Sequence, residues 1–517
     1  MEDKHIGQEH IGKKIFRGTL IIIIVSVLAK LSAFLSETVN AYYLGTTYQS
    51  DAYYMVSSIV QMLCPMLTIG IWKVFLPIYK DRITHGDREG ASRLTDQTIS
   101  FFALVSIAAA ILLAVFAGPF VSVVAPGYQG ETRRLCIELL RISAPAYVFI
   151  IVSGVYASML QCHNKFFGSQ IREVASHIPG ILAAIFLYRR FGIRVMAVAM
   201  VAGAVLRLLI ELPFVDWGYR FRPSLHFGGE EFRLMLRRLP SAFLSAGVHQ
   251  INTLIDRAMA SMFPEGSVSG MNYGHRLTNV FSGLLSTAIS TAMFPQMVEL
   301  IARQKREELN KLLTKILNIF MLLMIPVTVA CMLFSRDLVV AVFERGAFQD
   351  ESVSLTAGVF GFYSLGLLFV ACATVVSNVF YGFGDTRTPM LIGVTHMVIN
   401  VVLNLVLSRL MGVNGLALAT SLAAIIALGI RLFFVRKYVH LDWMHLGLCF
   451  GKILLASGIS CFGAWALVGR LDLNVYLRLL CAAGIGVALY LAAVKLLRVR
   501  EIEDLTALLL RRKQKKD

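Results

Sequence analysis

Ionisable side chains lie inside apolar stretches of this sequence. Lys30 and Glu37 interrupt the segment LIIIIVSVLAKLSAFLSETVNAYYLG, from Leu20 to Gly45, and their spacing of seven residues places both on one face of a helix. An ionisable group at the centre of a bilayer costs at least ~2.5–3.5 kcal/mol on insertion scales, so it usually faces a cavity or a partner. The pair could therefore bind an anionic headgroup, with the lysine acting as a point charge on phosphate.

Similar residues occur in later apolar segments. Asp51 opens the second segment, Lys73 lies inside it, and Arg276 lies in a much later one. We expect Lys30 and Arg276 to line a cationic cavity, with Glu37 and Asp51 as counter-charges or gates. Lys73 lies near a helix end, so it could instead extend its amine to the membrane interface. The alternative for the whole set is a group of ion pairs that hold helices together.

A second polar set suits a small, hard cation. Asp256 lies in NTLIDRAMAS and Thr420 in GLALATS. Asn400 and Asn404, in VINVVLNLV, are four residues apart and share a helix face. One carboxylate with amide and hydroxyl oxygens favours Na⁺ over a transition metal. The alternative is hydrogen bonding between helices, with Asp256 paired to a cation such as Arg257.

The sequence does not predict an enzyme. It contains no HExxH, no GxSxG and no glycine-rich phosphate loop, and it has no nucleotide-binding domain that would make it an ATP-driven pump. Eight cysteines lie in or beside apolar segments without a CxxC pair, which indicates small buried hydrophobic residues. No cofactor is expected apart from Na⁺ as a candidate coupling ion.

The elements that position these residues are membrane helices. The chain has 517 residues, of which 57% are hydrophobic and 16% charged, whereas a soluble domain carries roughly a quarter charged residues. Continuous apolar stretches of about 20 residues predict an all-α polytopic membrane protein. We expect fourteen helices, near residues 17–45, 51–80, 95–124, 131–162, 168–190, 193–218, 236–263, 267–303, 306–335, 350–383, 388–411, 413–438, 445–469 and 474–498.

The net charge of +17 follows the positive-inside rule better than it indicates nucleic-acid binding. Lysine and arginine cluster in alternate loops, whereas GTTYQS (45–50) and PEG (264–266) contain neither. Arg189, Arg190 and Arg194 depart from this pattern. With an even number of helices, both termini are expected on the cytoplasmic side.

A weak internal repeat predicts the domain organisation. VFLPIYK and AMFPQMV match at a shift of 218 residues, and SMLQCHNKFFGSQ matches SNVFYGFGDTRTP at a shift near 220. Parallel six-helix repeats imply two pseudo-symmetric lobes that enclose a central cavity, as in transporters. The predicted parts are an N-terminal lobe (1–218), a basic cytoplasmic linker (219–238), a C-terminal lobe (239–438), two extra helices (439–498) and a basic cytoplasmic tail (499–517).

Several motifs together resemble the MurJ (MviN) lipid II flippases of the MATE-like MOP exporter superfamily. They are SDAYYM (50–55), VVAPGY (123–128), SMLQCHNKF (158–166), GSVSGMNYGHRL (266–277), FERGAF (343–348), GDTRTP (384–389) and NGLALATS (414–421). The resemblance covers most of the chain. The two extra C-terminal helices are also similar to that family, whereas MATE drug exporters usually stop at twelve.

The resemblance implies a transporter that moves lipid II, an undecaprenyl-pyrophosphate-linked peptidoglycan precursor, between the leaflets of the bacterial cytoplasmic membrane. Such a protein serves cell-wall biogenesis and cell shape, and its partners would be the lipid-linked glycan, membrane lipids and cell-wall synthesis enzymes. Lys30, Asp51 and Arg276 match the family's substrate-site positions. The family's sodium site falls on Asp256, Asn400, Asn404 and Thr420.

The sequence departs from this family at two cationic positions, where it has Ser36 and Cys64. Lys73, nine residues after Cys64, could supply a charge, but lysine lacks the bidentate fork that suits a pyrophosphate. Two alternatives therefore stay open. One is a flippase for another lipid-linked oligosaccharide, such as an exopolysaccharide or teichoic precursor, and the other is a transport-inactive scaffold for cell-wall synthesis.

Overall fold

The computed structural model describes residues 24–215 and 217–499, and these are folded into helices without strands. They divide into two compact units, of which the first ends at Ser269 and the second begins at Gly270. The basic N-terminal residues and residues 500–517 of the predicted tail lie outside the described ranges. The prediction of an all-α polytopic membrane protein is confirmed.

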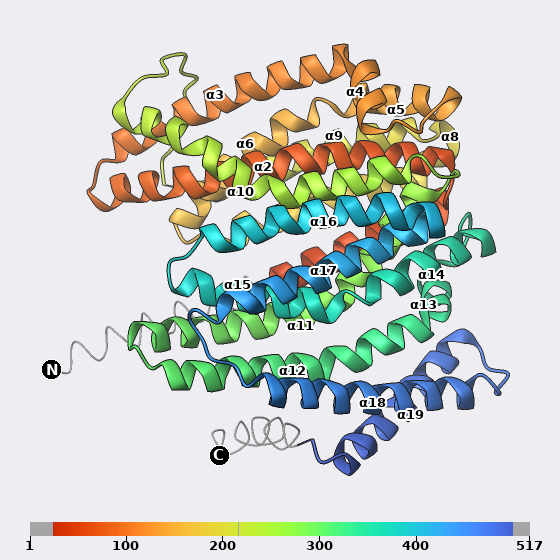
Figure 1. Cartoon of the computed structure of the whole chain (residues 1–517). Helices are drawn as coiled ribbons and strands as arrows, with labels where there is room; N and C mark the ends of the chain where they lie inside the picture. Colours follow the sequence, from red (N-terminus) through yellow and green to blue (C-terminus); the bar gives the residue numbers. More distant parts are fainter. Residues whose placement is uncertain (1–23, 216, 500–517) are drawn as a thin grey trace. The chain divides into compact units, whose positions relative to one another are not determined.

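The helices of the first unit begin with an unlabelled one at Ile24–Leu44. The others are α2 (Tyr48–Thr84), α3 (Arg88–Val115), α4 (Ala117–Val124), α5 (Gly130–Ser143), α6 (Ala146–Cys162), α7 (Phe166–Leu182), a π-helical turn η1 (Ala183–Leu187), α8 (Tyr188–Phe191), α9 (Arg194–Leu209), a 3₁₀ turn η2 (Leu212–Phe214) and α10 (Glu230–Ala260). Figure 1 shows them from red to yellow-green.

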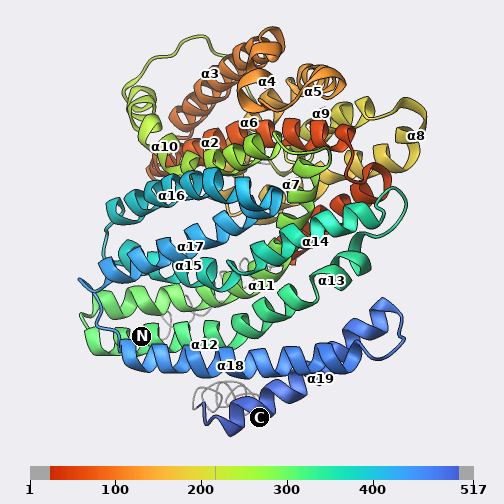
Figure 2. The same cartoon turned by 45° about the vertical axis from the view of Figure 1, so that its right-hand side comes forward.

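The second unit contains most of α11, which begins in the first unit. Its helices are α11 (Ser267–Ala302), α12 (Arg306–Leu333), α13 (Ser335–Phe343), α14 (Asp350–Ser364), α15 (Leu367–Gly382), α16 (Arg387–Met411), α17 (Val413–Val435), α18 (Trp443–Val468) and α19 (Val475–Leu496). Helices α18 and α19, the two extra helices of the sequence prediction, pack side by side (Figures 1 and 2). The core between α12, α15 and α18 includes Phe320, Phe380 and Ile453.

Ten helices of the described residues are long and apolar enough to cross a membrane. Two bent pairs, α5 with α6 and α14 with α15, raise the number to twelve if each pair is one span. Helices α10 and α11 occupy the two remaining predicted positions but are not among these candidates. The count of fourteen spans therefore stays a prediction.

The internal repeat is visible in the order of the helices. Corresponding helices start 218 to 221 residues apart, as α3 and α12, α5 and α14, and α7 and α16 do. Both bent pairs fall at the same place in the repeat, with angles of 43° and 40°. Equivalent breaks at equivalent positions support the duplication that the sequence motifs indicate.

Side-chain caps fix the start of several helices. Thr47 and Ser50 form a reciprocal capping box at the start of α2, and Asp87 caps α3 by accepting a hydrogen bond from the Gly90 amide at 2.8 Å. Asp442 caps α18 through the His445 amide at 3.0 Å. Each cap satisfies a backbone N–H that the helix itself leaves without an acceptor.

Helix α10 packs against α2 inside the first unit. Glycines allow the close approach, because a methyl group at Gly70 would collide with Phe243 and one at Gly247 would collide with Met66. The predicted C-terminal lobe (239–438) includes most of this helix, whereas the first compact unit extends to Ser269, so the two divisions differ by α10. The predicted linker also ends earlier, since α10 begins at Glu230.

The first part of the basic linker lies along α3. Asp96 accepts hydrogen bonds from the Tyr219 hydroxyl at 2.7 Å and from the Arg222 amide at 3.1 Å. The Ser224 amide donates to the Ser100 hydroxyl at 3.0 Å. The linker is thus bound to the first unit by its own backbone.

Candidate functional site

The first helix carries Lys30 on an exposed position and Glu37 on a buried one. The Tyr54 hydroxyl of α2 donates a hydrogen bond of 2.7 Å to Glu37 Oε2. This charge-assisted bond ties the first helix to α2. Glu37 therefore contributes to helix packing, and its predicted role as a counter-charge stays a prediction.

Asp51 joins the start of α2 to the start of α11. Its Oδ1 accepts hydrogen bonds from the Ser269 amide at 2.8 Å and from the Ser269 hydroxyl at 2.7 Å, and its Oδ2 accepts one from the Gly266 amide at 2.8 Å. A carboxylate at a helix N-terminus satisfies free backbone amides and complements the helix dipole. Asp51 therefore links the starts of α2 and α11 by hydrogen bonds, and its predicted role as a gate stays a prediction.

The predicted cations are divided between the two units. Lys30 and Lys73 belong to the first unit, where both side chains are exposed, and Arg276 belongs to the second, where it is half-buried on α11. Beside Arg276, the His275 ring lies 5.6 Å from the Tyr363 ring and Nδ1 lies 3.3 Å from the Asn279 amide nitrogen. A cavity shared by Lys30 and Arg276 stays a prediction.

Three of the four predicted sodium ligands lie together on α16 and α17. The Asn404 side-chain amide donates to Asn400 Oδ1 at 3.0 Å, and the Asn400 amide donates to the Thr420 hydroxyl at 3.2 Å. Both asparagines are fully buried. Oxygens of this kind suit a hard cation, so this part of the site fits Na⁺. Asp256 is buried on α10 in the first unit, and its share in the site stays a prediction.

The positions where the sequence departs from the family differ in their surroundings. Cys64 is buried with Val60, Leu113 and Tyr147 in a small apolar cluster. Ser36 is half-buried, and a methyl group at Gly180 of α7 would lie 4.0 Å from its hydroxyl. Neither position carries a cation.

A cluster of four charged residues in the first unit was not predicted from the sequence; it consists of Arg172, Glu173, Arg207 and Glu211. They lie on α7, on α9 and just after α9. Arg207 binds Glu173 with both terminal nitrogens, at 2.7 and 3.1 Å. The signal was present, because Arg172 and Glu173 are charges inside an apolar span and Arg207 and Glu211 are four residues apart.

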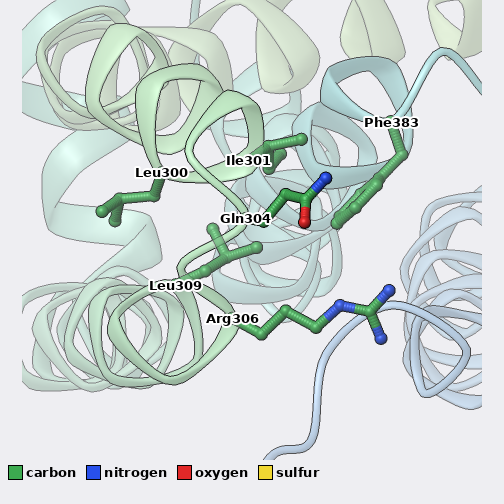
Figure 3. Close-up of a pocket in the computed structure, with 6 residues that line it drawn as sticks. All are labelled: Leu300, Ile301, Gln304, Arg306, Leu309 and Phe383. Atoms are coloured by element: carbon green, nitrogen blue, oxygen red, sulfur yellow. The ribbon is translucent and has the colours of Figure 1, made fainter.

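The second unit contains a cavity of about 510 Å³ where α11, α12 and the end of α15 meet. Figure 3 shows the side chains that line it, with the Gln304 amide near the Phe383 ring and the Arg306 guanidinium below them. None of the predicted site residues is among those lining it. The cavity is therefore separate from the predicted sites.

Comparison with known proteins assigns the chain to a family. The family model for the lipid II flippase MurJ matches residues 40–478. A probable lipid II flippase MurJ of Thermotoga maritima is 25% identical over 493 residues, covering 94% of this chain and 98% of the relative. That of Rickettsia prowazekii is 22% identical over 510 residues, covering 95% and 99%.

Solved structures show the same fold. A lipid II flippase MurJ in an inward closed conformation matches with a TM-score of 0.81 at 24% identity, covering 92% of this chain and 98% of that one. An inward-facing multidrug resistance MATE transporter of the MOP superfamily matches with a TM-score of 0.67 at 14% identity, covering 83% and 99%. The resemblance inferred from the motifs is confirmed, and since the family model spans most of its length, the chain belongs to the lipid II flippase MurJ family.

Proposed function

We propose that this protein moves lipid II across the bacterial inner membrane by alternating access between two helical units. Membership of the flippase family over residues 40–478 carries the proposal. It is a multi-pass membrane transporter and not an enzyme, in agreement with its ten to twelve candidate spans. Its substrate is a lipid-linked glycan with a pyrophosphate, which requires cations inside an apolar protein.

Lys30 and Arg276 hold the pyrophosphate in this proposal. The exposed side chain of Lys30 and the half-buried side chain of Arg276 support it, because each lies on a helix of mainly apolar residues. Asp51 serves as the gate that closes α2 on the start of α11. Glu37 and the exposed Lys73 adjust the charge near the substrate.

Energy for vectorial movement comes from an ion gradient or the membrane potential, and one charge crossing 100 mV is worth ~2.3 kcal/mol. Na⁺ would be held by the oxygens of Asn400, Asn404 and Thr420, with Asp256 supplying the negative charge. Bound Na⁺ would shift the equilibrium between the inward- and outward-open conformations only by the difference in its binding free energy to the two. The close contact of the three uncharged side chains supports this choice of ligands.

A second candidate substrate is another lipid-linked oligosaccharide. The observation that favours it is Cys64, which is packed in an apolar cluster where the family has an arginine. A less cationic site would tolerate a different anionic group. A transport-inactive scaffold would retain the fold without either activity.

Complementation tests these proposals. The gene is expressed in cells depleted of their own lipid II flippase, and growth is measured beside membrane abundance of the protein. We expect growth with the wild type and with Lys30→Arg, and no growth with Lys30→Ala or Arg276→Ala at unchanged abundance. Failure of the abundant wild type would contradict lipid II transport. Loss of the alanine variants from the membrane would show a structural role instead.

The orientation and the protein partners follow from the same proposal. Positive charge in alternate loops supports an orientation with both termini in the cytoplasm. A cysteine at each end, tested with a membrane-impermeant thiol reagent on intact cells, should stay unlabelled. Enzymes of cell-wall synthesis are the expected partners, because they make and consume the substrate.

A further inference from the structure

The charged cluster of the first unit is made by three helices and one turn. Arg172 and Glu173 come from α7, Arg207 from α9, and Glu211 from the turn before η2. Ser153 of α6 completes it, because its carbonyl and hydroxyl oxygens accept hydrogen bonds from Arg172 Nη1 at 3.1 and 3.2 Å. With two arginines and two glutamates, the cluster is neutral only when all four side chains are ionised.

The two carboxylates are not equally compensated. Glu173 receives two hydrogen bonds from Arg207, at distances normal for charge-assisted bonds. Glu211 is fully buried, and its nearest charge is Arg172 Nη1 at 3.4 Å. The Ser153 hydroxyl lies close enough to act on this carboxylate, but neither oxygen of Glu211 receives a hydrogen bond of normal geometry from the described residues. A fully buried carboxylate that is poorly hydrogen-bonded is among the most expensive groups to keep ionised.

Arg172 is not free to form a stronger ion pair with Glu211. Its Nη1 already donates to both oxygens of Ser153, and its Nε lies 3.5 Å from Glu173. The same guanidinium is thus shared between α6, Glu173 and Glu211. A proton on Glu211 would neutralise this carboxylate, so that Arg172 would need to compensate only Glu173. It would also add an O–H donor to the cluster.

We propose that Glu211 is a proton-binding site of the first unit, embedded among the helices α6, α7 and α9. It is separate from the polar set on α16 and α17, which belongs to the other unit. The ligand is a single proton and not a metal ion, because both arginines would repel a second cation. The site needs no lipid-linked substrate, so it does not depend on the proposed transport function.

The groups that face Glu211 come from each element packed around it. They are Arg172 and Glu173 on α7, Arg207 on α9, and Ser153 and Tyr156 on α6. His177, one helical turn after Glu173, also acts on that glutamate. Proton uptake by Glu211 would leave Arg172 bound to Glu173 and Ser153. The turn between α9 and η2 would then lose its ionic attachment to α7.

Infrared difference spectroscopy on the purified full-length protein tests the site directly. The probe is the proton, supplied by lowering the pH of the buffer, and the signal is the carbonyl stretch of a protonated buried carboxyl group. We expect this band in the wild type and its loss in Glu211→Gln. The matched control is Glu138→Gln, because Glu138 is an exposed carboxylate held by Arg194 at 2.5 and 3.1 Å. The control should retain the band.

A second variant, Glu211→Asp, keeps the experiment informative if the first one does not fold. If Glu211→Gln does not fold, Glu211→Asp keeps a carboxyl group on a shorter side chain, and its band should shift in frequency. A wild-type band that is unchanged in Glu211→Gln, or unshifted in Glu211→Asp, would overturn the proposal. Absence of any buried carboxyl band in the wild type would do the same.

Discussion

The two units bury polar side chains in opposite ways. In the first unit, the fully buried Glu211 and the half-buried Glu173 lie beside two arginines, and charge compensates charge. In the second, Asn400 and Thr420 share an uncharged ladder of hydrogen bonds with Asn404. Removing one partner of a buried ion pair leaves an uncompensated charge, which costs roughly 3–5 kcal/mol. A hydrogen bond between membrane helices is worth about 0.6 kcal/mol on average.

The difference has a functional consequence. The ion cluster resists the loss of any member, so it acts as a structural clamp unless a proton changes its charge. The uncharged ladder loses little when its hydrogen bonds open, so its oxygens are available to a cation. We therefore expect the ion cluster to respond to a proton, and the uncharged hydrogen-bonded side chains to respond to a metal cation.

The largest expected effect comes from breaking the ion cluster. Arg207→Ala removes both hydrogen bonds to Glu173 and should lower the free energy of unfolding by roughly 2–4 kcal/mol, which is less than for a fully buried pair because the Glu173 side chain is 38% exposed. Thermal unfolding of the detergent-solubilised protein, followed by size-exclusion chromatography, would show it. Arg194→Ala is the control, because its pair with Glu138 is exposed and such pairs contribute about 0–1 kcal/mol. Similar losses in the two variants would contradict the clamp.

The second prediction concerns the close approach of α16 and α17 beside the ladder. A methyl group at Gly415 would collide with the backbone of Leu407 and Ser408. Gly415→Ala should therefore destabilise the second unit by roughly 1–3 kcal/mol, as overpacking does. Gly429 lies on the same helix with nothing within 4 Å of an added methyl group, so Gly429→Ala should be neutral or slightly stabilising. Equal effects at both glycines would mean that helix propensity, and not contact, decides.

Most of the fold could be predicted from the sequence. Each predicted helix overlaps a helix of the structure because long apolar stretches and caps are local signals. The assignment of α10 could not be predicted, since it depends on the fit of Gly70 against Phe243 across 173 positions of sequence. The repeat motifs indicated the duplication but not which unit the intervening helix would join.

The candidate sites show the same contrast between local sequence signals and contacts that only packing creates. Asn400 and Asn404 were predicted to share a helix face because their four-residue spacing is visible in the sequence. Thr420, on the next helix, was added to them from its residue type and from the family resemblance. The ion cluster was missed because its members lie on different helices, and only packing of α7 on α9 brings Arg207 to Glu173. The partners of Asp51 are backbone amides, which residue types cannot reveal.

The third prediction tests the ladder as a ligand site. Na⁺ at ten times its dissociation constant should stabilise the protein by about 1.4 kcal/mol, whereas K⁺ at equal ionic strength should not. Thermal unfolding in the two salts measures this difference. Asn400→Ala should abolish the Na⁺ response, and Asp256→Ala tests whether the first unit contributes the carboxylate. An equal response to both cations, or an unchanged one in both variants, would exclude a sodium site.

The smallest effects are expected at two half-buried aspartates that cap helices in the loops, one in each unit. Asp87 accepts a hydrogen bond from the Gly90 amide and pairs with Arg82, and these contacts hold the pKa of its carboxyl group below the usual value. Asp385 accepts hydrogen bonds from the Thr388 amide at 3.0 Å and the Tyr438 hydroxyl at 3.1 Å, which also lower its pKa.

A lowered pKa means that each cap stabilises the fold above the unfolded-state value of 3.8 and stops doing so as the pH falls through the folded-state pKa. Asp87→Asn and Asp385→Asn keep a capping oxygen, so both should change stability little at neutral pH and flatten the acid limb of its pH profile. The salt dependence of the folding free energy should distinguish the two caps. Added NaCl should weaken the wild-type contribution of Asp87, whose partner Arg82 is charged, and leave that of Asp385, whose partners are neutral. Unfolding temperatures across pH at low and high salt would measure this, and equal salt sensitivity at both loops would show that general surface charge dominates over the individual partners.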